Sequence, residues 1–233
     1  MRRALGTLGI ALVSVAVTPA NFGGWAVVTF DEVPEYLEVG KSTTLSFKIR
    51  QHGMSLREDL SPTLTLRDAD AGWLSRILKR DRVPANLSGP AGSYETAFTP
   101  LQAGRFFLVI DTDLFGWTTN TLPIQVVARG ESAVRMTPYQ RGQQLFAGKG
   151  CAVCHQKLDD PDLADIRVVP VGPALTDRVF DDEWLSLKLA DPASYRMTVI
   201  NGVEMPDLEL RQSEIASLVQ YINGRHETIV TSR

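Results

Sequence analysis

Apolar and polar residues alternate in short runs through the first half of the chain, from Trp25 to Ala128. The runs are Trp25 to Phe30, Thr43 to Arg50, Pro62 to Asp68, Ser93 to Phe98, Arg105 to Asp111 and Leu122 to Ala128. Turn signals separate them, at Val39-Gly40, His52-Gly53, Ser88-Gly89-Pro90 and Ala103-Gly104. Period-two runs between turns are typical of antiparallel strands, so this region predicts an all-β sandwich. Residues 73–82 lack the alternation, and we interpret them as an inserted short helix or loop.

The pattern changes to a helical period after a polar stretch at 129–136. Thr137-Pro138 is typical of a helix N-cap followed by proline at the first helical position. Near the C-terminus, apolar residues fall on one face of a predicted helix that ends at about Asn223-Gly224. These residues are Ile215, Leu218, Val219 and Ile222. This helix begins near Arg211, which cannot accept backbone N–H groups as a cap does, so Ser213 is an alternative cap for a later start.

These changes of pattern predict the domain organisation. Residues 21–130 form the sandwich, 131–136 a linker, and 137–233 a second, helical domain. Residues 1–20 read as a secretory signal, since Arg2 and Arg3 precede an uncharged run and small residues end at Ala20. An uncleaved membrane anchor is the alternative, because no charged residue occurs from Ala4 to Phe30.

The charge and the cysteine content of the chain limit the partners and the disulfide bonds that are expected. The chain has 24 basic and 27 acidic residues, and removal of the signal leaves 22 against 27, a formal charge of −5. Without a basic stripe a nucleic-acid partner is not expected, and a docking partner is expected to present positive charge. The chain holds only two cysteines, Cys151 and Cys154, so no disulfide is available unless they pair with each other.

The two cysteines belong to Cys151-Ala152-Val153-Cys154-His155, the attachment signature of c-type haem, in which two thiols bond the macrocycle and the imidazole reaches the iron. A thioredoxin-like pair needs no histidine there and usually lies in a βαβ setting. A zinc site would need further paired ligands, which the sequence lacks. The motif therefore predicts one covalent haem c.

From about Thr137 to Gly224 the chain resembles the class I monohaem cytochrome c family. Besides the haem motif, the resemblance rests on Gly142 and Phe146 in the first helix, Tyr221 in the last, and Val171-Gly172-Pro173-Ala174-Leu175. It implies an all-α domain in which Gly142 lets the last helix cross closely. It also implies that the Pro173 carbonyl orients the His155 imidazole.

The same resemblance implies that Met205 is the second axial ligand, since Pro206 and Leu208 follow it before the final helix. Met197 lacks the proline, and His226 and His52 lie past the last helix and in the other domain. A thioether ligand raises the reduction potential and leaves little room for oxygen. The expected metal ligands are thus His155 and Met205, with Cys151, Cys154 and Pro173 completing the cofactor site.

Two clusters of acidic residues are interpreted as structural features. The cluster Asp159, Asp160, Asp162 and Asp165 lacks the glycine and closing glutamate of an EF-hand, and we interpret it as a solvated loop. Asp181-Asp182-Glu183, ahead of Trp184, is interpreted as a charged helix start, which the helix dipole favours.

The sandwich is similar to small exported immunoglobulin-like modules of the YtkA type. The similarity rests on Val33-Pro34-Glu35-Tyr36-Leu37, Arg50-Gln51-His52-Gly53, Gly92-Ser93-Tyr94 and Ala103-Gly104-Arg105. A binuclear copper site is excluded, because the segment has no cysteine and only His52. We interpret this module as a docking or spacing domain.

The expected protein is an exported cytochrome, an electron carrier and not an enzyme, that passes single electrons between redox partners in the periplasm or at the outer face of the cytoplasmic membrane. A membrane oxidoreductase is the expected partner, and the N-terminus is a candidate for membrane association. One alternative is a haem enzyme or gas sensor with a displaceable sixth ligand. Another is a structural subunit of a membrane redox complex.

Overall fold

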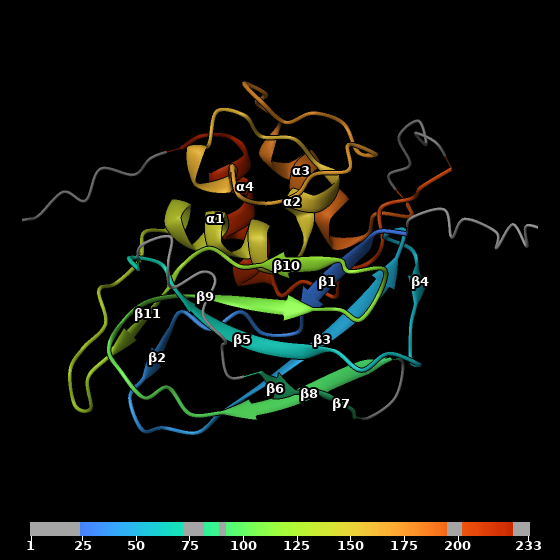
Figure 1. The fold of residues 1–233 in the computed structure, drawn as a ribbon. Coiled ribbons are helices and arrows are strands. Elements are labelled where there is room, and N and C mark those ends of the chain that lie inside the picture. The colour runs from blue at the N-terminus through green and yellow to red at the C-terminus, as the bar shows by residue number, and fades with distance from the viewer. Residues whose placement is uncertain (1–23, 72–81, 89–91, 195–201, 226–233) are drawn as a thin grey trace, which may run out of the picture.

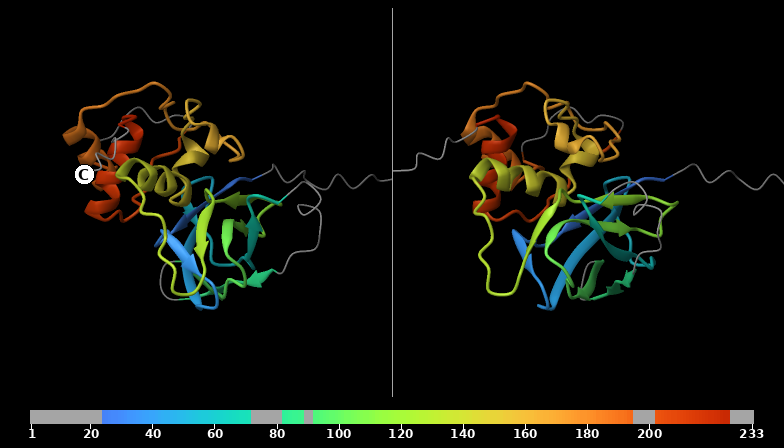
Figure 2. Two further views of the ribbon diagram at one scale, coloured as in Figure 1. Left: turned by 90° about the vertical axis from the view of Figure 1, so that its left-hand side faces the viewer. Right: turned by 60° about the vertical axis from the view of Figure 1, so that its left-hand side comes forward.

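The computed structural model describes residues 24–71, 82–88, 92–194 and 202–225, and the structural statements below concern those ranges. Two sheets lie together on one side of the molecule and the helices on the other (Figure 1). The two further views in Figure 2 show the same separation. The predicted signal or anchor at 1–20, Met197 and His226 lie outside the described residues, as does nearly all of the 73–82 segment.

The first sheet has the strand order β1-β3-β8-β7, and β4 also pairs with β3. Its strands are β1 (Ala26–Phe30), β3 (Thr43–Gln51), β4 (Ser55–Leu56), β7 (Asn86–Leu87) and β8 (Ser93–Phe98). All pairs in it are antiparallel. Its inner face is aromatic, with the Phe47 ring 5.9 Å from Tyr94 and 5.7 Å from Phe30 between centroids.

The second sheet has the strand order β2-β11-β9-β5-β6, and β10 pairs with β9. Its strands are β2 (Tyr36–Glu38), β5 (Thr63–Asp68), β6 (Val83–Pro84), β9 (Gly104–Asp111), β10 (Thr118–Asn120) and β11 (Ile124–Val127). Only β2 and β11 run parallel; the other pairs are antiparallel. Buried Leu64, Leu108 and Ile124 contribute to the core of this half.

The six strands predicted from alternation are confirmed, each within two residues of its expected bounds. The five further strands have two or three residues each and were not predicted. Segments this short cannot display a period of two. They pair only because longer neighbours supply the partner groups.

The helical part contains α1 (Pro138–Gly148), α2 (Cys151–Cys154), α3 (Asp182–Ala190), α4 (Gln212–Ile222) and a 3₁₀ turn at Pro161–Leu163. The predicted Thr137 cap is confirmed: its hydroxyl accepts from Gln140 N, and the Gln140 side chain accepts from Thr137 N. The acidic start of α3 is also confirmed, since Asp181 Oδ1 accepts from Trp184 N at 2.8 Å.

Helix α4 begins at Gln212, so the later start capped by Ser213 is wrong. The guanidinium of Arg211 has no acceptor atom, so Arg211 does not accept a hydrogen bond as a cap residue does. Its backbone N–H donates one instead. Glu214 Oε2 accepts a 2.9 Å hydrogen bond from the Arg211 backbone N–H. The helix ends at Ile222, before Asn223-Gly224, as predicted.

The predicted fold class, an all-β immunoglobulin-like sandwich followed by an all-α class I cytochrome c domain, is wrong. The described residues are mostly β-structure, in two sheets of which one is a half-barrel, and only three helices exceed one turn. Much of the C-terminal part is loop, because Pro161, Pro170, Gly172 and Pro173 interrupt the chain between α2 and α3. Proline lacks the N–H that a helix interior needs, so an all-α class I cytochrome c domain is not seen.

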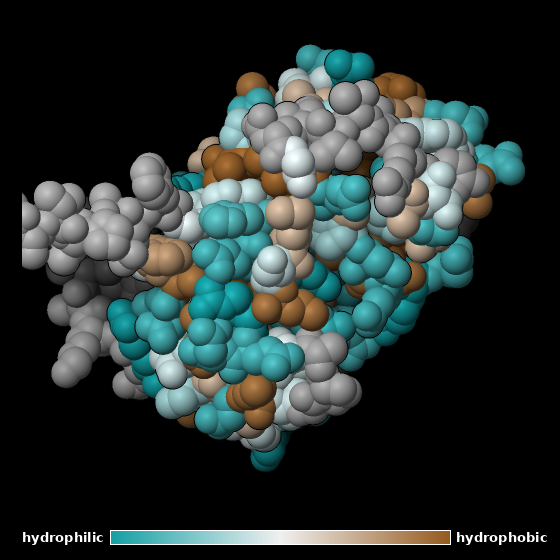
Figure 3. Space-filling model, turned by 90° about the vertical axis from the view of Figure 1, so that its right-hand side faces the viewer, coloured by the Kyte–Doolittle hydropathy of each residue, from teal (hydrophilic) through white to brown (hydrophobic). Residues whose placement is uncertain are grey.

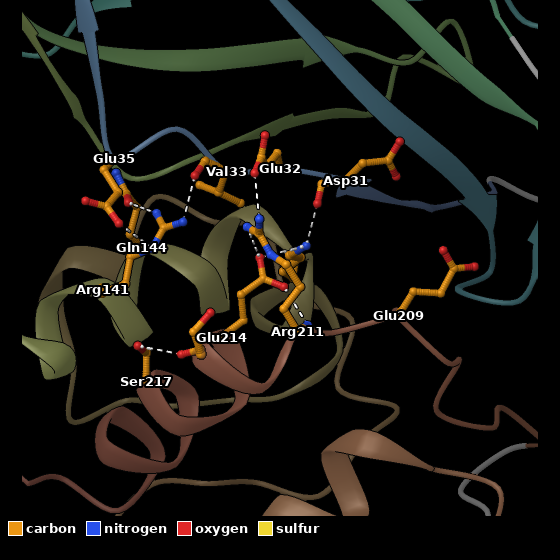
Figure 4. A network of polar contacts seen from close by, with 12 residues as sticks. Asp31, Glu32, Val33, Glu35, Arg141, Gln144, Glu209, Arg211, Glu214 and Ser217 are labelled. Atoms are coloured by element: carbon orange, nitrogen blue, oxygen red, sulfur yellow. Dashed lines mark hydrogen bonds and ion pairs between the residues drawn. The ribbon is translucent and has the colours of Figure 1, made fainter.

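The β-strands and the helices meet along a contact between β1, the segment after it, and helices α1, α2 and α4, which we call the junction. At one end of the junction, hydrogen bonds and ion pairs connect the two parts (Figure 4). Lys149 Nζ donates to Asp31 O at 2.8 Å and pairs with Glu214 at 3.1 Å. Arg141 donates to Val33 O at 2.8 Å. These bonds fix the helices on the outer side of β1.

Candidate functional site

The crossing of α1 and α4 positions the cysteine motif. A Cβ atom at Gly142 would lie 2.0 Å from Ser217 O and 2.6 Å from Tyr221 Cβ, so only glycine allows this approach. Directly beyond the crossing, the Phe146 and Tyr221 rings lie 5.3 Å apart between centroids. The expected close crossing at Gly142 is therefore confirmed. Helix α1 ends at Gly148, three residues before Cys151, and so places the start of the motif.

Gly150 makes the turn between α1 and α2. Its φ of 83° lies in the left-handed region, and a Cβ atom there would lie 2.4 Å from Val27 Cγ1 and 2.7 Å from Val28 O. A side chain is excluded both by backbone conformation and by contact with β1. The cysteine motif consequently begins against the first strand of the β-part.

The motif opens into a pocket that holds about 1400 Å³ of empty space, part of it open to solvent. All five predicted site residues line this pocket: Cys151, Cys154, His155, Pro173 and Met205. The rest of the lining is largely apolar and includes Phe146, Leu175, Phe180, Trp184, Leu185, Leu189, Leu208 and Ile222. A mostly apolar cavity with a few polar groups is typical of a small-molecule or cofactor site.

His155 is held by the loop that contains Gly172 and Pro173. Its Nδ1 lies 2.9 Å from Pro173 O, and because a carbonyl only accepts, Nδ1 carries the proton and Nε2 keeps its lone pair. A Cβ atom at Gly172 would lie 2.4 Å from His155 Cε1, so the ring packs directly on glycine backbone. Burial lowers the pKa of His155, although the Pro173 contact opposes this. The neutral imidazole is the form that binds a metal.

The two thiols are unpaired with each other and stand one helical turn apart in α2. Burial raises the pKa of Cys151 to about 12 and that of Cys154 to about 11. Both are therefore protonated at neutral pH. Neutral thiols, one buried and one partly buried, suit covalent attachment to an apolar group better than metal coordination, which requires thiolate.

Met205 lies half-buried in the loop that leads to α4 and lines the same pocket, followed by Pro206 and buried Leu208. Its thioether is thus available on the pocket wall. His52 is exposed in the turn after β3 and is not a lining residue, although its neighbour Gly53 is. The structure brings the two expected metal ligands, His155 and Met205, to one cavity.

The acidic loop differs from its interpretation. Asp160 is buried and accepts hydrogen bonds from Gln143 Nε2 at 2.9 Å and from Tyr221 OH at 2.6 Å. It secures the loop after the cysteine motif to α1 and α4, so the reading as a fully solvated loop is wrong for this residue. Neighbouring Asp162 and Asp165 are exposed. Across the described ranges no group of three or more His, Cys, Asp or Glu side chains could hold a metal ion.

Sequence reasoning missed the contribution of the β-part to the pocket, from Val27 and Gly53. The signal was present in β1: Ala26 to Phe30 contains no charged residue and only one polar one, and all five residues are buried. A strand that does not alternate is covered on both faces. Trp184 and Lys188 of α3, also lining residues, carried no such signal because their helix is only nine residues long.

Scans against protein-family models and curated proteins gave no match. In the part of the chain that the structure describes, no helix is long and apolar enough to cross a membrane.

Proposed function

We propose that this protein is a c-type haem protein that carries one covalent haem and transfers single electrons outside the cytoplasm. The observation that carries the proposal is the meeting of the Cys151-to-His155 motif and Met205 in one largely apolar pocket. The haem would supply a one-electron centre, its iron changing between the ferric and ferrous states. The protein would hold, orient and shield that centre.

Cys151 and Cys154 would hold the macrocycle. Each S–H would add across one vinyl C=C bond, with sulfur bonded to one carbon and hydrogen to the other and no oxidant consumed. The raised thiol pKa values keep both sulfurs protonated until attachment. Their burial also protects the thioethers from solvent once they are made.

His155 would bind iron through Nε2. The Pro173 carbonyl, 2.9 Å from Nδ1, fixes both the tautomer and the ring orientation and makes the imidazole a stronger donor. Gly172 supports this arrangement, because its lack of a side chain lets the ring lie against the loop. The loop thus holds the imidazole in the tautomer and orientation that a metal needs.

Met205 would be the second protein ligand of the iron, and such a thioether would favour ferrous iron and close the iron to small ligands. Closure of the iron to small ligands distinguishes an electron carrier from a haem enzyme or gas sensor. We expect the reduced, haem-loaded protein not to bind carbon monoxide, and Met205→Ala to bind it. The control is Met54→Ala, since Met54 is an exposed methionine outside the pocket. Rapid carbon monoxide binding by the unaltered protein would contradict the carrier assignment.

Export and partner choice are part of the proposal. Residues 1–20 would direct the chain across the cytoplasmic membrane, and the acidic mature protein would exchange electrons with a redox partner of opposite charge, such as a membrane oxidoreductase. On the face shown in Figure 3, hydrophobic residues form small separate patches among hydrophilic ones. Such a surface favours transient docking over a permanent apolar interface.

A further inference from the structure

Strand β1 is an edge strand of its sheet, yet it has no exposed residue. The helical part lies against β1 at one point and against the segment after it at another. A Cβ atom at Gly148 would lie 2.6 Å from Val33 Cγ2, and one at Gly150 would lie 2.4 Å from Val27 Cγ1. Backbone of the segment that leads into Cys151 therefore lies directly on the β-part.

The β-part also reaches the pocket itself. Val27 of β1 and Gly53 of the turn after β3 line it together with Cys151, Cys154 and His155. Gly53 has a φ of 74°, and a Cβ atom there would lie 3.1 Å from Trp25 Cη2. The turn therefore presents bare backbone to the pocket, backed by an indole ring. Val27 is 4% exposed, so its methyl groups are shared between the β-part and the pocket.

We propose that Val27 and Gly53 are haem-contacting residues, and that the β-part is a wall of the haem site rather than a separate spacer. The inference rests on the proposed function, since it names further residues of the same site. The wall is apolar at this point: an aliphatic side chain and a glycine face the cysteine motif. It would exclude water from the edge of the macrocycle that carries the thioethers.

Water exclusion has a measurable effect on the iron. A dry, apolar surrounding disfavours the additional positive charge of the ferric state, so it raises the reduction potential. A hydroxyl placed at Val27 would weaken this effect, because its dipole stabilises the ferric form. Val27→Thr conserves the shape of the side chain and the β-branching that a strand favours. We expect it to lower the potential.

The direct test is nuclear magnetic resonance of the full, haem-loaded chain with labelled valine methyl groups, recorded in the ferric and ferrous states. Protons near the iron change their shift between the two states, and the effect falls steeply with distance. We expect a large change at Val27 and a much smaller one at Val126, an equally buried residue of β11 that does not line the pocket. Val27→Thr and Val126→Thr serve to assign the two signals.

The potential of the same two variants, measured by spectroelectrochemistry, gives a second readout. Val27→Thr should lower it, and Val126→Thr should leave it unchanged. Equal shift changes at the two valines, with equal potentials in the two variants, would overturn the wall proposal while the haem assignment stands. A chain that attaches no haem would overturn both.

Discussion

The two ends of the junction differ in chemistry although they join the same parts. At the pocket end, Val27 and Gly53 line the same pocket as the cysteine motif, and Val27 lies against Gly150, the residue before Cys151. At the other end, Figure 4 shows Glu214 beside Arg211, which extends to Glu32. Glu214 also forms a buried pair with Lys149, with side chains only 3% and 2% exposed, and Lys149 in addition lines the pocket. The charged end needs defined partners and so fixes the geometry. The apolar end needs only complementary shape, so it can accept a cofactor.

The largest expected effect comes from breaking the buried pair. Lys149→Met leaves Glu214 without its main counter-charge and Asp31 O without its donor, which should cost about 3 kcal/mol of stability. Urea unfolding of the full chain measures it. Lys48→Met removes the pair with Glu209, whose side chain is 73% exposed, and should cost less than about 1 kcal/mol. Equal losses in the two variants would show that the buried pair does not fix the junction.

A smaller effect is expected at the apolar end. Gly150→Ala forces a methyl group against Val27 and the Val28 carbonyl, and overpacking of this kind costs about 1–3 kcal/mol. Gly130→Ala is a matched control, since Gly130 has nearly the same φ, 81° against 83°, and nothing within 4 Å. The difference between the two variants in denaturant unfolding isolates the contact with β1. No difference would mean that the two parts do not pack closely there.

The charged end should also respond to acid. Burial raises the pKa of Glu214, but the Arg211 N–H and the Lys149 ammonium outweigh it, so the folded pKa lies below the ordinary value of 4.5. A carboxyl with a lowered pKa stabilises the fold above its unfolded pKa, and this contribution is lost as pH falls through the folded pKa. We expect the stability lost between pH 7 and acid to be smaller in Glu214→Gln. An equal loss of stability with acid in the unaltered protein and in Glu214→Gln would mean that Glu214 does not contribute to the pH dependence.

The smallest effect belongs to the outer part of the network. Arg211 and Glu32 pair at 2.6 Å, but their side chains are 53% and 74% exposed. Exposed ion pairs contribute about 0–1 kcal/mol, so Glu32→Gln should shift the urea midpoint only slightly. A loss as large as that of Lys149→Met would mean that the charged end depends on its surface and not on its buried pair.

The sequence predicted the longer elements well and the junction not at all. Alternation located the strand Ser93–Phe98 to the residue, and the Thr137-Pro138 signal located the start of α1, because these are local properties. The fold class failed because proline-rich loops between α2 and α3 replaced the helices that a family resemblance implied. A resemblance carried by separate motifs says little about the segments between them.

The candidate site was likewise predicted only in part. The five predicted residues line one pocket. Cys151, Cys154 and His155 belong to one short motif, whereas Pro173 and Met205 were implied by the family resemblance. Lys149 and Val27 could not be found in this way. A lysine before glycine reads as exposed. The uncharged run of β1 indicates that Val27 is covered, but not by which segment, so both roles depend on contacts between distant segments that a periodic pattern does not encode.

Covalent haem at Cys151 and Cys154 is the central claim, and the mass of the intact protein tests it most directly. The full chain would be produced in a bacterium that exports it and attaches c-type haem, then denatured and weighed by mass spectrometry. We expect the chain mass plus one haem that denaturation does not remove, and the bare chain mass for Cys151→Ala combined with Cys154→Ala. An unmodified chain with two free thiols, obtained from cells that attach haem to a known cytochrome, would contradict the account.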